Sequence, residues 1–531
     1  MQNSPRNWLA RRARGIVPAA ALGLALAFPA AGQTELNVAI HADLKNIDPI
    51  WTTALITSNH GYAVYDTLFA TDADFNVQPQ MAEGYTVSDD GLAYTITLRD
   101  GLNWHDGTPV TAKDCVASIN RWGQRDVFGQ LLLDRTDSIV AADDRTIVLT
   151  LKEPWALAIA ALGKKNANVP FMMPERVAMT DPHEQIKEMI GSGPFRILED
   201  EWVPGSRVVY EKNADYVPRS EPASETAGGK AVHFDRLVWQ YIPDAQTTAN
   251  ALVAGEIDLI ENVPADLVPQ LNDAEGITVE PTDGLGWQPW LVINHLHPPF
   301  DNVKARQALQ LMADQATYQL ANSSLEGSWR TCPAMFICDT PHASELGSER
   351  LMQQNIEAAK KLLAESGYNG EPVVLLHPTD IPQLHSASLV SAALLREIGV
   401  NVDDQAMDWS TLTSRRAEKK APADGGWNLF HTAWPASMLL NPMMHNGVSG
   451  ACDAAWFGWP CDDELQDLRA KFSRESDPEM LVTLSRRMQE RAMEYVTYIP
   501  LGQYFFYRAY RDEVSGVIKS TDAFFWNIRK N

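Results

Sequence analysis

The stretch 84–122 constrains the fold most, because it fixes a strand, two turns and a helix in one order. Residues 94–98 alternate apolar and polar side chains, and this period of two predicts a half-buried strand. Glycine-containing turns flank that strand, and 105–109 forms another turn cluster. Thr111 and Asp114 have the spacing of a capping box, so the sequence predicts that a helix begins there.

This order of strand, turn and capped helix resembles the segment by which family 5 extracytoplasmic solute-binding proteins are identified. These proteins are the binding components of ABC importers for peptides, nickel and related solutes. The matching residues are 94–98, Leu102, 105–107, 109–112 and Asp114. The resemblance implies an α/β, two-lobed periplasmic-binding-protein fold with a hinge and an extra domain inserted in the first lobe. We expect the stretch itself to build structure and not to contact the ligand.

The resemblance covers almost all of the chain after its first 34 residues. A length of 531 residues is ample for several cores. The domains implied are a signal peptide at 1–32, lobe I at 33–78, the extra domain of lobe I at 79–190, lobe I again at 191–283, lobe II at 284–505 and a return to lobe I at 506–531.

The amino terminus has the pattern of a secretory signal peptide. The first 34 residues contain four arginines and no acid, and 16–28 is apolar but too short to span a bilayer stably. Small residues at 30–32 offer a cleavage site before Gln33. We therefore expect a periplasmic protein, with a short membrane anchor as the alternative. The general and the twin-arginine export routes both stay open.

The charge of the chain excludes several classes of partner. The net charge is −24, and removal of the first 34 residues leaves 40 basic and 68 acidic side chains, or −28. Such a surface repels nucleic acid and anionic lipid headgroups. We expect a monomer that does not bind nucleic acid.

The five cysteines predict two local disulfides in an exported protein. Cys332 and Cys338 are six residues apart, and Cys452 and Cys461 are nine apart. Cys115 is left over on the expected buried face of its helix. Because C-x2-C pairs are absent, the cysteines do not have zinc-site spacing. We predict no metal site and no cofactor.

Tryptophans are the candidate lining of a ligand cleft. A large flat ring gives contact area at little entropic cost and can stack on a cation. Five of the sixteen tryptophans fall where the resemblance places the cleft, although each could also be an ordinary core residue. These candidates are Trp51, Trp287, Trp290, Trp409 and Trp434.

The polar candidates are fewer. In peptide binders of the family, the run matching 430–440 often supplies an acid for the ligand's amino terminus, but here it contains no Asp or Glu. Asp43 or Asp408 could supply that charge from elsewhere. His431 could donate a hydrogen bond to a ligand carboxylate. The alternative is that it is a structural histidine, with its hydrogen bonds satisfied within the protein. Arg330 is the candidate for two-point carboxylate binding, with a surface salt bridge as the alternative.

The sequence therefore predicts the periplasmic substrate-binding protein of an ABC importer. It would capture a small peptide or an amino-acid-derived solute, such as an opine, in an interlobe cleft and deliver it to a permease in the inner membrane. Catalysis is not expected. The alternative is a nickel-chelate or other non-peptide solute binder of the same family. A secreted glycoside hydrolase is the distant alternative, since nothing singles out a catalytic acid pair.

Overall fold

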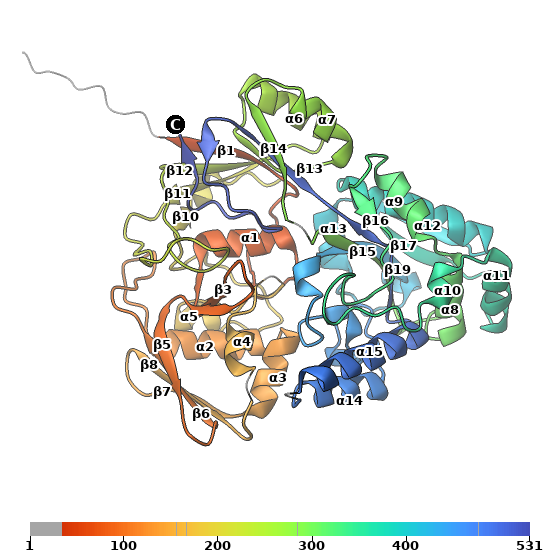
Figure 1. Cartoon of the computed structure of the whole chain (residues 1–531), viewed down its shortest axis with the longest axis horizontal. Helices are drawn as coiled ribbons and strands as arrows, with labels where there is room; N and C mark the ends of the chain where they lie inside the picture. The colour runs from red at the N-terminus through yellow and green to blue at the C-terminus, as the bar shows by residue number, and fades with distance from the viewer. Residues whose placement is uncertain (1–33, 156, 166, 284, 476) are drawn as a thin grey trace, which may run out of the picture. The chain divides into compact units, whose positions relative to one another are not determined.

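The structure is a computed structural model that describes residues 34–531 except 156, 166, 284 and 476. The expected signal peptide lies outside the described residues. Two seven-stranded sheets form the centres of two lobes, and a separate four-stranded sheet belongs to the region between Ala82 and Leu151 (Figure 1). This mixed architecture agrees with the predicted α/β fold of two lobes.

Lobe I is the body built on the first seven-stranded sheet, whose strand order is β10-β11-β12-β1-β13-β22-β14. β1 pairs in parallel with β12 and β13, and the other pairings are antiparallel. β22, near the end of the chain, pairs with both β13 and β14, so the C-terminal part is an integral element of this sheet. The strands are β1 (Glu35–Ile40), β10 (Phe195–Ile197), β11 (Arg207–Lys212), β12 (Arg236–Tyr241), β13 (Leu259–Val263), β14 (Ile277–Pro281) and β22 (Tyr507–Arg511).

Lobe II is built on the second sheet, of order β16-β21-β15-β19-β17-β18, with β20 also paired to β15. β17 is parallel to β18 and β19, and the pairings of β15 are antiparallel. All seven residues of β15 are buried, as expected for a central strand covered on both faces. The strands are β15 (Trp287–Ile293), β16 (Trp329–Arg330), β17 (Val373–Pro378), β18 (Val402–Met407), β19 (Leu429–Pro435), β20 (Tyr498–Pro500) and β21 (Gln503–Tyr504).

The four-stranded antiparallel sheet has the order β5-β6-β8-β7, from β5 (Ala82–Val87), β6 (Ala93–Leu98), β7 (Thr136–Ala141) and β8 (Thr146–Leu151). β6 alternates half-buried and buried side chains, which confirms the predicted strand. Helix α2 (Ala112–Gly123) begins after a complete capping box of Thr111 and Asp114, which confirms the predicted helix start. The limits 79–190 of the inserted domain stay a prediction.

The remaining elements surround these sheets (Figure 1). The helices of the first part of the chain are α1 (Leu55–Val64), α3 (Val127–Arg135), α4 (Ala158–Leu162), α5 (Glu175–Ala178), α6 (Ala245–Ala254) and α7 (Val268–Asn272). Those of the second part are α8 (Val303–Met312), α9 (Gln315–Asn322), α10 (Glu349–Met352), α11 (Ile356–Glu365), α12 (Pro382–Glu397), α13 (Trp409–Arg415), α14 (Asp463–Phe472) and α15 (Pro478–Tyr495). Three short strand pairs are β2 (Asp66–Thr67) with β9 (Phe171–Met172), β3 (Phe69–Thr71) with β4 (Val77–Pro79), and β23 (Val514–Ser515) with β24 (Arg529–Lys530). Among the described residues, no helix has the length and apolarity needed to cross a bilayer.

Candidate functional site

A cavity of about 140 Å³ lies between the two lobes and is lined by residues of both. Its walls are mainly apolar and aromatic, which is the usual character of a small-molecule site. Six aromatic side chains line it, and three of them are tryptophans predicted from the sequence. These six are Tyr241, Trp287, Trp409, Trp434, Tyr504 and Phe506.

Arg416 places a positive charge at this cavity. It follows the last turn of α13, and its side chain is almost fully buried, with 2% of the residue exposed. The guanidinium lies 5.5 Å from the ring centre of Trp409, 5.4 Å from that of Trp456 and 4.7 Å from that of Phe457. Burial lowers the pKa of Arg416 to about 9. The aromatic faces offset part of the cost of burying this charge.

Asp380 places a negative charge at the same cavity. Its Oδ1 accepts a hydrogen bond of 2.7 Å from the backbone N–H of Trp409, and its Oδ2 accepts one of 3.0 Å from the Tyr241 hydroxyl. Within the described part of the chain, no lysine, arginine or histidine forms an ion pair with Asp380. An ionised carboxylate has about four acceptor positions, so Asp380 can accept further hydrogen bonds from a ligand.

Several polar atoms around the cavity have no partner among the described residues. They include the indole N–H groups of Trp287 and Trp434 and the Nε of Arg416, all of which are donors. Asn262 contributes one unpaired acceptor, its Oδ1. Buried polar groups are normally hydrogen-bonded, so these atoms indicate a site that is completed by another molecule.

Direct contacts join the lobes around the cavity. Lys45 Nζ lies 2.6 Å from Asp408 Oδ1. Arg416 donates a hydrogen bond of 3.1 Å to the Thr53 hydroxyl. Asp408 also caps the N-terminus of α13, since it accepts from the N–H of Thr411. Asp408 is therefore already paired and is exposed at the rim, where a surface ion pair contributes little stability.

Trp290 and His431, two further candidates, do not line the cavity. Trp290 is completely buried and stacks on Tyr498 with ring centres 3.9 Å apart. Its ring also packs against that of Trp434, with ring centres 5.2 Å apart. His431 is also completely buried, and its Nε2 lies 2.9 Å from the Ser391 hydroxyl. Burial lowers the pKa of His431 to about 3, so the ring is neutral. Both residues are packing elements of the central strands β15 and β19.

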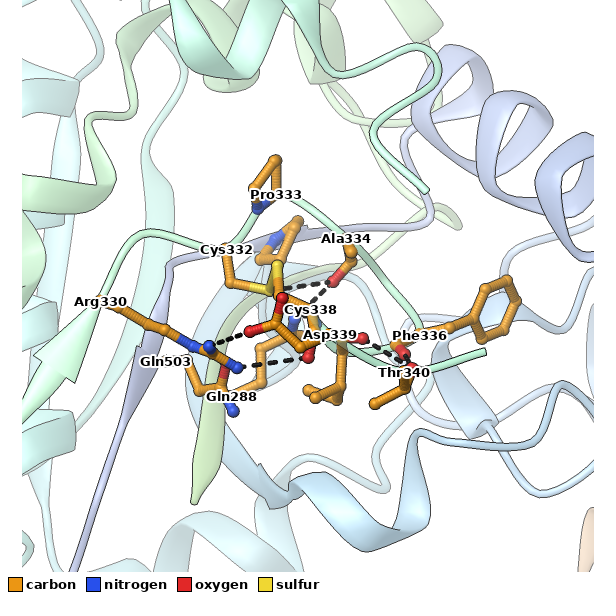
Figure 2. Close-up of a disulfide and its surroundings, with 12 residues drawn as sticks. Gln288, Arg330, Cys332, Pro333, Ala334, Phe336, Cys338, Asp339, Thr340 and Gln503 are labelled. Atoms are coloured by element: carbon orange, nitrogen blue, oxygen red, sulfur yellow. Dashed lines mark hydrogen bonds and ion pairs between the residues drawn. A yellow bond between two sulfur atoms is a disulfide. The ribbon is translucent and has the colours of Figure 1, made fainter. Parts of the chain in front are cut away.

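Arg330, the expected carboxylate-binding residue, is paired within the protein (Figure 2). It forms an ion pair with Asp339, its Nη2 donates to the Cys338 carbonyl at 3.2 Å, and its Nε donates to Gln503 Oε1 at 2.8 Å. The side chain does not line the interlobe cavity. A guanidinium satisfied in this way holds the disulfide loop and has little capacity left for a ligand.

Trp51 and Asp43 also lie outside the cavity lining. The indole N–H of Trp51 donates to the His183 carbonyl at 3.1 Å. Asp43 is buried, and its Oδ1 accepts from the Gly205 N–H at 2.9 Å. The carbonyl of Asp43 also accepts a hydrogen bond of 3.2 Å from the Ser410 hydroxyl of lobe II, and its Oδ2 has no partner among the described residues.

Two disulfides are present, between Cys332 and Cys338 and between Cys452 and Cys461, while Cys115 is free and buried. The second disulfide closes a loop that carries Trp456, which packs on Arg416. The first closes a loop beside Arg330 (Figure 2), and neither of its cysteines lines the cavity. Among the described residues, no group of three or more His, Cys, Asp or Glu side chains is arranged to hold a metal ion.

The two charged residues of the cavity, Arg416 and Asp380, are absent from the sequence-based candidates. Arg416 stands in the basic run 415–420, which has the composition of a solvated surface. Asp380 stands in the sequence His377-Pro-Thr-Asp, which is typical of a turn. Their position in the chain was one available signal. Asp380 follows β17, and Arg416 follows β18 and the short helix α13. In an α/β sheet, residues that follow the carboxyl ends of the strands often lie at the ligand-binding cleft.

Comparison with known proteins gives consistent results. A family model described as bacterial extracellular solute-binding proteins, family 5 (middle), matches residues 76–451. A Sinorhizobium fredii protein named "Probable peptide ABC transporter periplasmic-binding protein y4tO" is 39% identical over 520 residues, which cover 96% of this chain and 97% of the relative. The glutathione-binding protein GsiB of Salmonella typhimurium is 27% identical over 426 residues, covering 79% of this chain and 78% of the relative.

Solved structures share the fold. The binding protein AgaA of Agrobacterium tumefaciens R10, in complex with agropinic acid, superposes with a TM-score of 0.79 at 21% identity, covering 94% of this chain and 99% of that chain. A Pseudoalteromonas dipeptide-binding protein in complex with Met-Leu gives a TM-score of 0.77 at 20% identity, covering 94% of this chain and 100% of that chain. At these identities the likeness concerns the fold alone.

Proposed function

Because the chain belongs to the family 5 bacterial extracellular solute-binding proteins, we propose that it captures a small peptide or an amino-acid-derived solute between its lobes and delivers it to the permease of an ABC importer. The family and its fold are those of transport proteins and not of enzymes. The proposed location is the periplasm, reached through the N-terminal signal peptide, and the proposed partner is an inner-membrane permease.

One observation carries the choice of solute: Asp380 faces an aromatic cavity with no cationic partner among the described residues. A solute ammonium group would supply the missing positive charge, in the way that charge-assisted hydrogen bonds normally satisfy a carboxylate. The acid that is missing from 430–440 is then provided by a different loop. The names of two relatives, a probable peptide-binding protein and a glutathione-binding protein, support this solute class.

The contacts between the lobes favour a short solute. The two lobes already touch beside the cavity through Lys45 and Asp408. A long peptide that extends beyond the cavity would separate these contacts. A short solute can be enclosed with the contacts kept, and enclosure by both lobes is what makes closure depend on the ligand.

Native mass spectrometry of protein purified without refolding from peptide-rich medium tests the proposal. We expect discrete added masses in the range of di- and tripeptides or of single amino-acid derivatives. Asp380→Asn should lose these masses, whereas the matched control Asp403→Asn, an exposed acid on β18, should keep them. A single mass with a nickel isotope pattern would assign the protein to the nickel-chelate alternative.

A thermal-shift series gives a second readout of the same proposal. A solute at 100 times its Kd stabilises the folded protein by about 2.7 kcal/mol. Purified protein that carries no added mass, and whose Tm is unchanged by a pool of dipeptides at millimolar concentration, would contradict the proposed function.

A further inference from the structure

Three side chains of lobe II join β18, β17 and α12 through two hydrogen bonds. Asp404 Oδ1 lies 2.8 Å from His377 Nδ1, and His377 Nε2 lies 2.7 Å from His385 Nδ1. His377 is buried, with 4% of the residue exposed, whereas His385 is partly exposed. None of the three residues lines the interlobe cavity.

The carboxylate of Asp404 fixes the direction of these hydrogen bonds. An ionised aspartate can only accept, so Nδ1 of His377 carries a proton and Nε2 of the neutral ring is an acceptor. Nδ1 of His385 then donates to it. One added proton keeps the bond, because a charged His377 donates from Nε2 to an unprotonated Nδ1 of His385. A second added proton removes the last lone pair between the rings, so two charged rings cannot form this bond.

The bond between the two histidines closes a short segment of the chain that belongs to the cavity. His377 lies in β17 and His385 in the first turn of α12, and the seven residues between them are 378–384. Five of these seven line the cavity, Asp380 among them. α12 begins without a hydrogen bond from a side-chain N-cap, so the usual means of fixing a helix start is missing here. The histidine pair fixes both ends of the segment instead.

The titratable groups of the neighbouring β19 and α13 do not compete for the pair. His431 lies beside His377 in the parallel pairing of β17 and β19, and burial lowers the pKa of His431 to about 3, so its ring stays neutral. On α13, which also packs against β17, Asp408 pairs with Lys45, and Arg415 donates to two backbone carbonyls.

Two further helices, α9 and α8, pack against α12. α9 contributes Tyr318, whose hydroxyl is bonded to a serine hydroxyl of α12 at 2.7 Å. α8 contributes Lys304, which pairs with Glu365, and Arg306, which donates to backbone carbonyls. Asp404 is therefore the charged group that acts directly on the two histidines.

We propose that His377 and His385 are positioning residues, whose bond holds the segment 378–384 in the conformation that presents Asp380 to the solute, and that acid releases the segment by charging both rings. This inference rests on the proposed function and deepens it, because it adds control of the same site by pH. The protein binds its solute at neutral pH and loses affinity in acidic surroundings.

The direction of this pH dependence follows from the two protonation steps. Burial and, to a smaller extent, the neighbouring His377 lower the pKa of His385, while Asp404 acts in the opposite sense. The ordinary pKa of histidine is about 6.5, so at about pH 7 at least one ring is neutral and the bond forms. As the pH falls below about 6, the second ring gains its proton and the bond is lost.

Titration with a pool of dipeptides at about pH 7 and about pH 5 tests the proposal, with the bound fraction read by native mass spectrometry. A dipeptide keeps both terminal charges between these values. We expect the apparent Kd of the wild-type protein to rise roughly 2- to 10-fold at the lower pH, the effect of losing one hydrogen bond. His342→Gln replaces a partly buried histidine of the same lobe outside the cavity lining, and as the matched control it should show the same rise.

Two variants of His385 separate positioning from the other effects of acid. Asn carries its amide nitrogen on Cγ, as histidine carries Nδ1, and its amide can either donate to His377 or accept from it. His385→Asn should therefore bind like the wild type at about pH 7 and show no loss at about pH 5, whereas His385→Leu should bind weakly at both. A wild-type Kd that does not change, or a rise that persists in His385→Asn, would overturn the proposal.

Hydrogen–deuterium exchange of the solute-free protein gives a readout that does not depend on the proposed function. At about pH 7, the peptide covering 378–385 should exchange faster in His385→Leu than in the wild type, His385→Asn and His342→Gln. Equal exchange in all four proteins would overturn the positioning role and leave the proposed function standing. If no dipeptide binds the wild type at either pH while His385→Leu still exchanges faster, the proposed function fails and the role of the pair in holding the segment stands. Circular dichroism of each variant confirms that it is folded.

Discussion

The Tyr241 hydroxyl donates a hydrogen bond of 3.0 Å to Oδ2 of Asp380, and this bond crosses from lobe I to lobe II. The accepting carboxylate also lines the interlobe cavity. In the proposed function, the same side chain contacts both the other lobe and the solute. A solute bound to Asp380 would hold this carboxylate within reach of Tyr241, so binding would be coupled to closure.

Removal of the Tyr241 hydroxyl should weaken solute binding without unfolding the protein. Tyr241→Phe keeps the ring that lines the cavity and loses one hydrogen bond, whose net contribution is about 0.5–1.5 kcal/mol, so affinity should fall roughly 2- to 10-fold. Isothermal titration with a dipeptide identified by mass spectrometry measures the change. Tyr368→Phe is the control and should bind normally, because it loses the bonds to the Glu371 carbonyl and the Asn401 N–H and does not line the cavity. Equal affinities would contradict the coupling.

Loss of Arg121 should destabilise lobe I strongly. Arg121→Met leaves the Asp48 carboxylate buried without its cation, and breaking such a pair costs about 3–5 kcal/mol. Urea denaturation followed by tryptophan fluorescence measures the free energy of unfolding. Arg330→Met removes a partly exposed pair and should cost less than about 1 kcal/mol. A similar cost for both would show that the burial of Arg121 contributes nothing to stability.

Four buried histidines should make the protein less stable in mild acid. Burial lowers the pKa of His60, His431 and His445 to about 3, and that of His295 well below its usual value. Between pH 6.5 and 3 the unfolded chain binds protons that the folded chain does not, so stability falls as pH decreases through this window.

The expected loss is roughly 2 kcal/mol for each of His60, His431 and His445 between pH 7.5 and 5. Denaturant titrations at the two pH values measure it. His431→Gln should show a shallower dependence on pH than wild type, and the exposed-histidine variant His183→Gln should show an unchanged one. Identical slopes for wild type and His431→Gln would refute the assignment of a neutral buried ring.

Removal of the Cys452–Cys461 disulfide should affect binding as well as stability. The bond closes a loop of nine residues, so the double serine variant should lose about 2–3 kcal/mol of unfolding free energy. It should also weaken the binding of free dipeptides, because Trp456 in this loop packs on Arg416. The Cys332–Cys338 double serine variant is the control, with a similar loss of stability and unchanged affinity. Reversed behaviour of the two variants would contradict the role of the loop.

Local sequence patterns were sufficient to predict part of this structure. The strand at 94–98 and the capped helix after Thr111 depend on neighbours within a few residues, so periodicity and capping chemistry identify them. The two-lobed fold was implied by the resemblance of the stretch 84–122 to the family 5 solute-binding proteins. Of the predicted tryptophans, Trp287, Trp409 and Trp434 line the cavity.

The charged residues of the site could not be predicted in the same way. The environment of Arg416 is made by Thr53 of lobe I and by Trp456 and Phe457 of a disulfide loop, all distant in sequence. Arg330 had the more suggestive position, beside a cysteine pair, but its acceptors Asp339 and Gln503 come from loops whose approach is set by tertiary packing. Whether an arginine is free for a ligand depends on which acceptors surround it, and a linear pattern does not contain that information.

Trp409 belongs to both charged ends of the cavity. Its backbone N–H holds Asp380, and its ring packs against the guanidinium of Arg416. One rigid side chain therefore sets the interval between the negative and the positive group. In the proposed function, a solute that reaches both groups has to match that interval, so the distance between its polar ends is selected more strictly than its side chains.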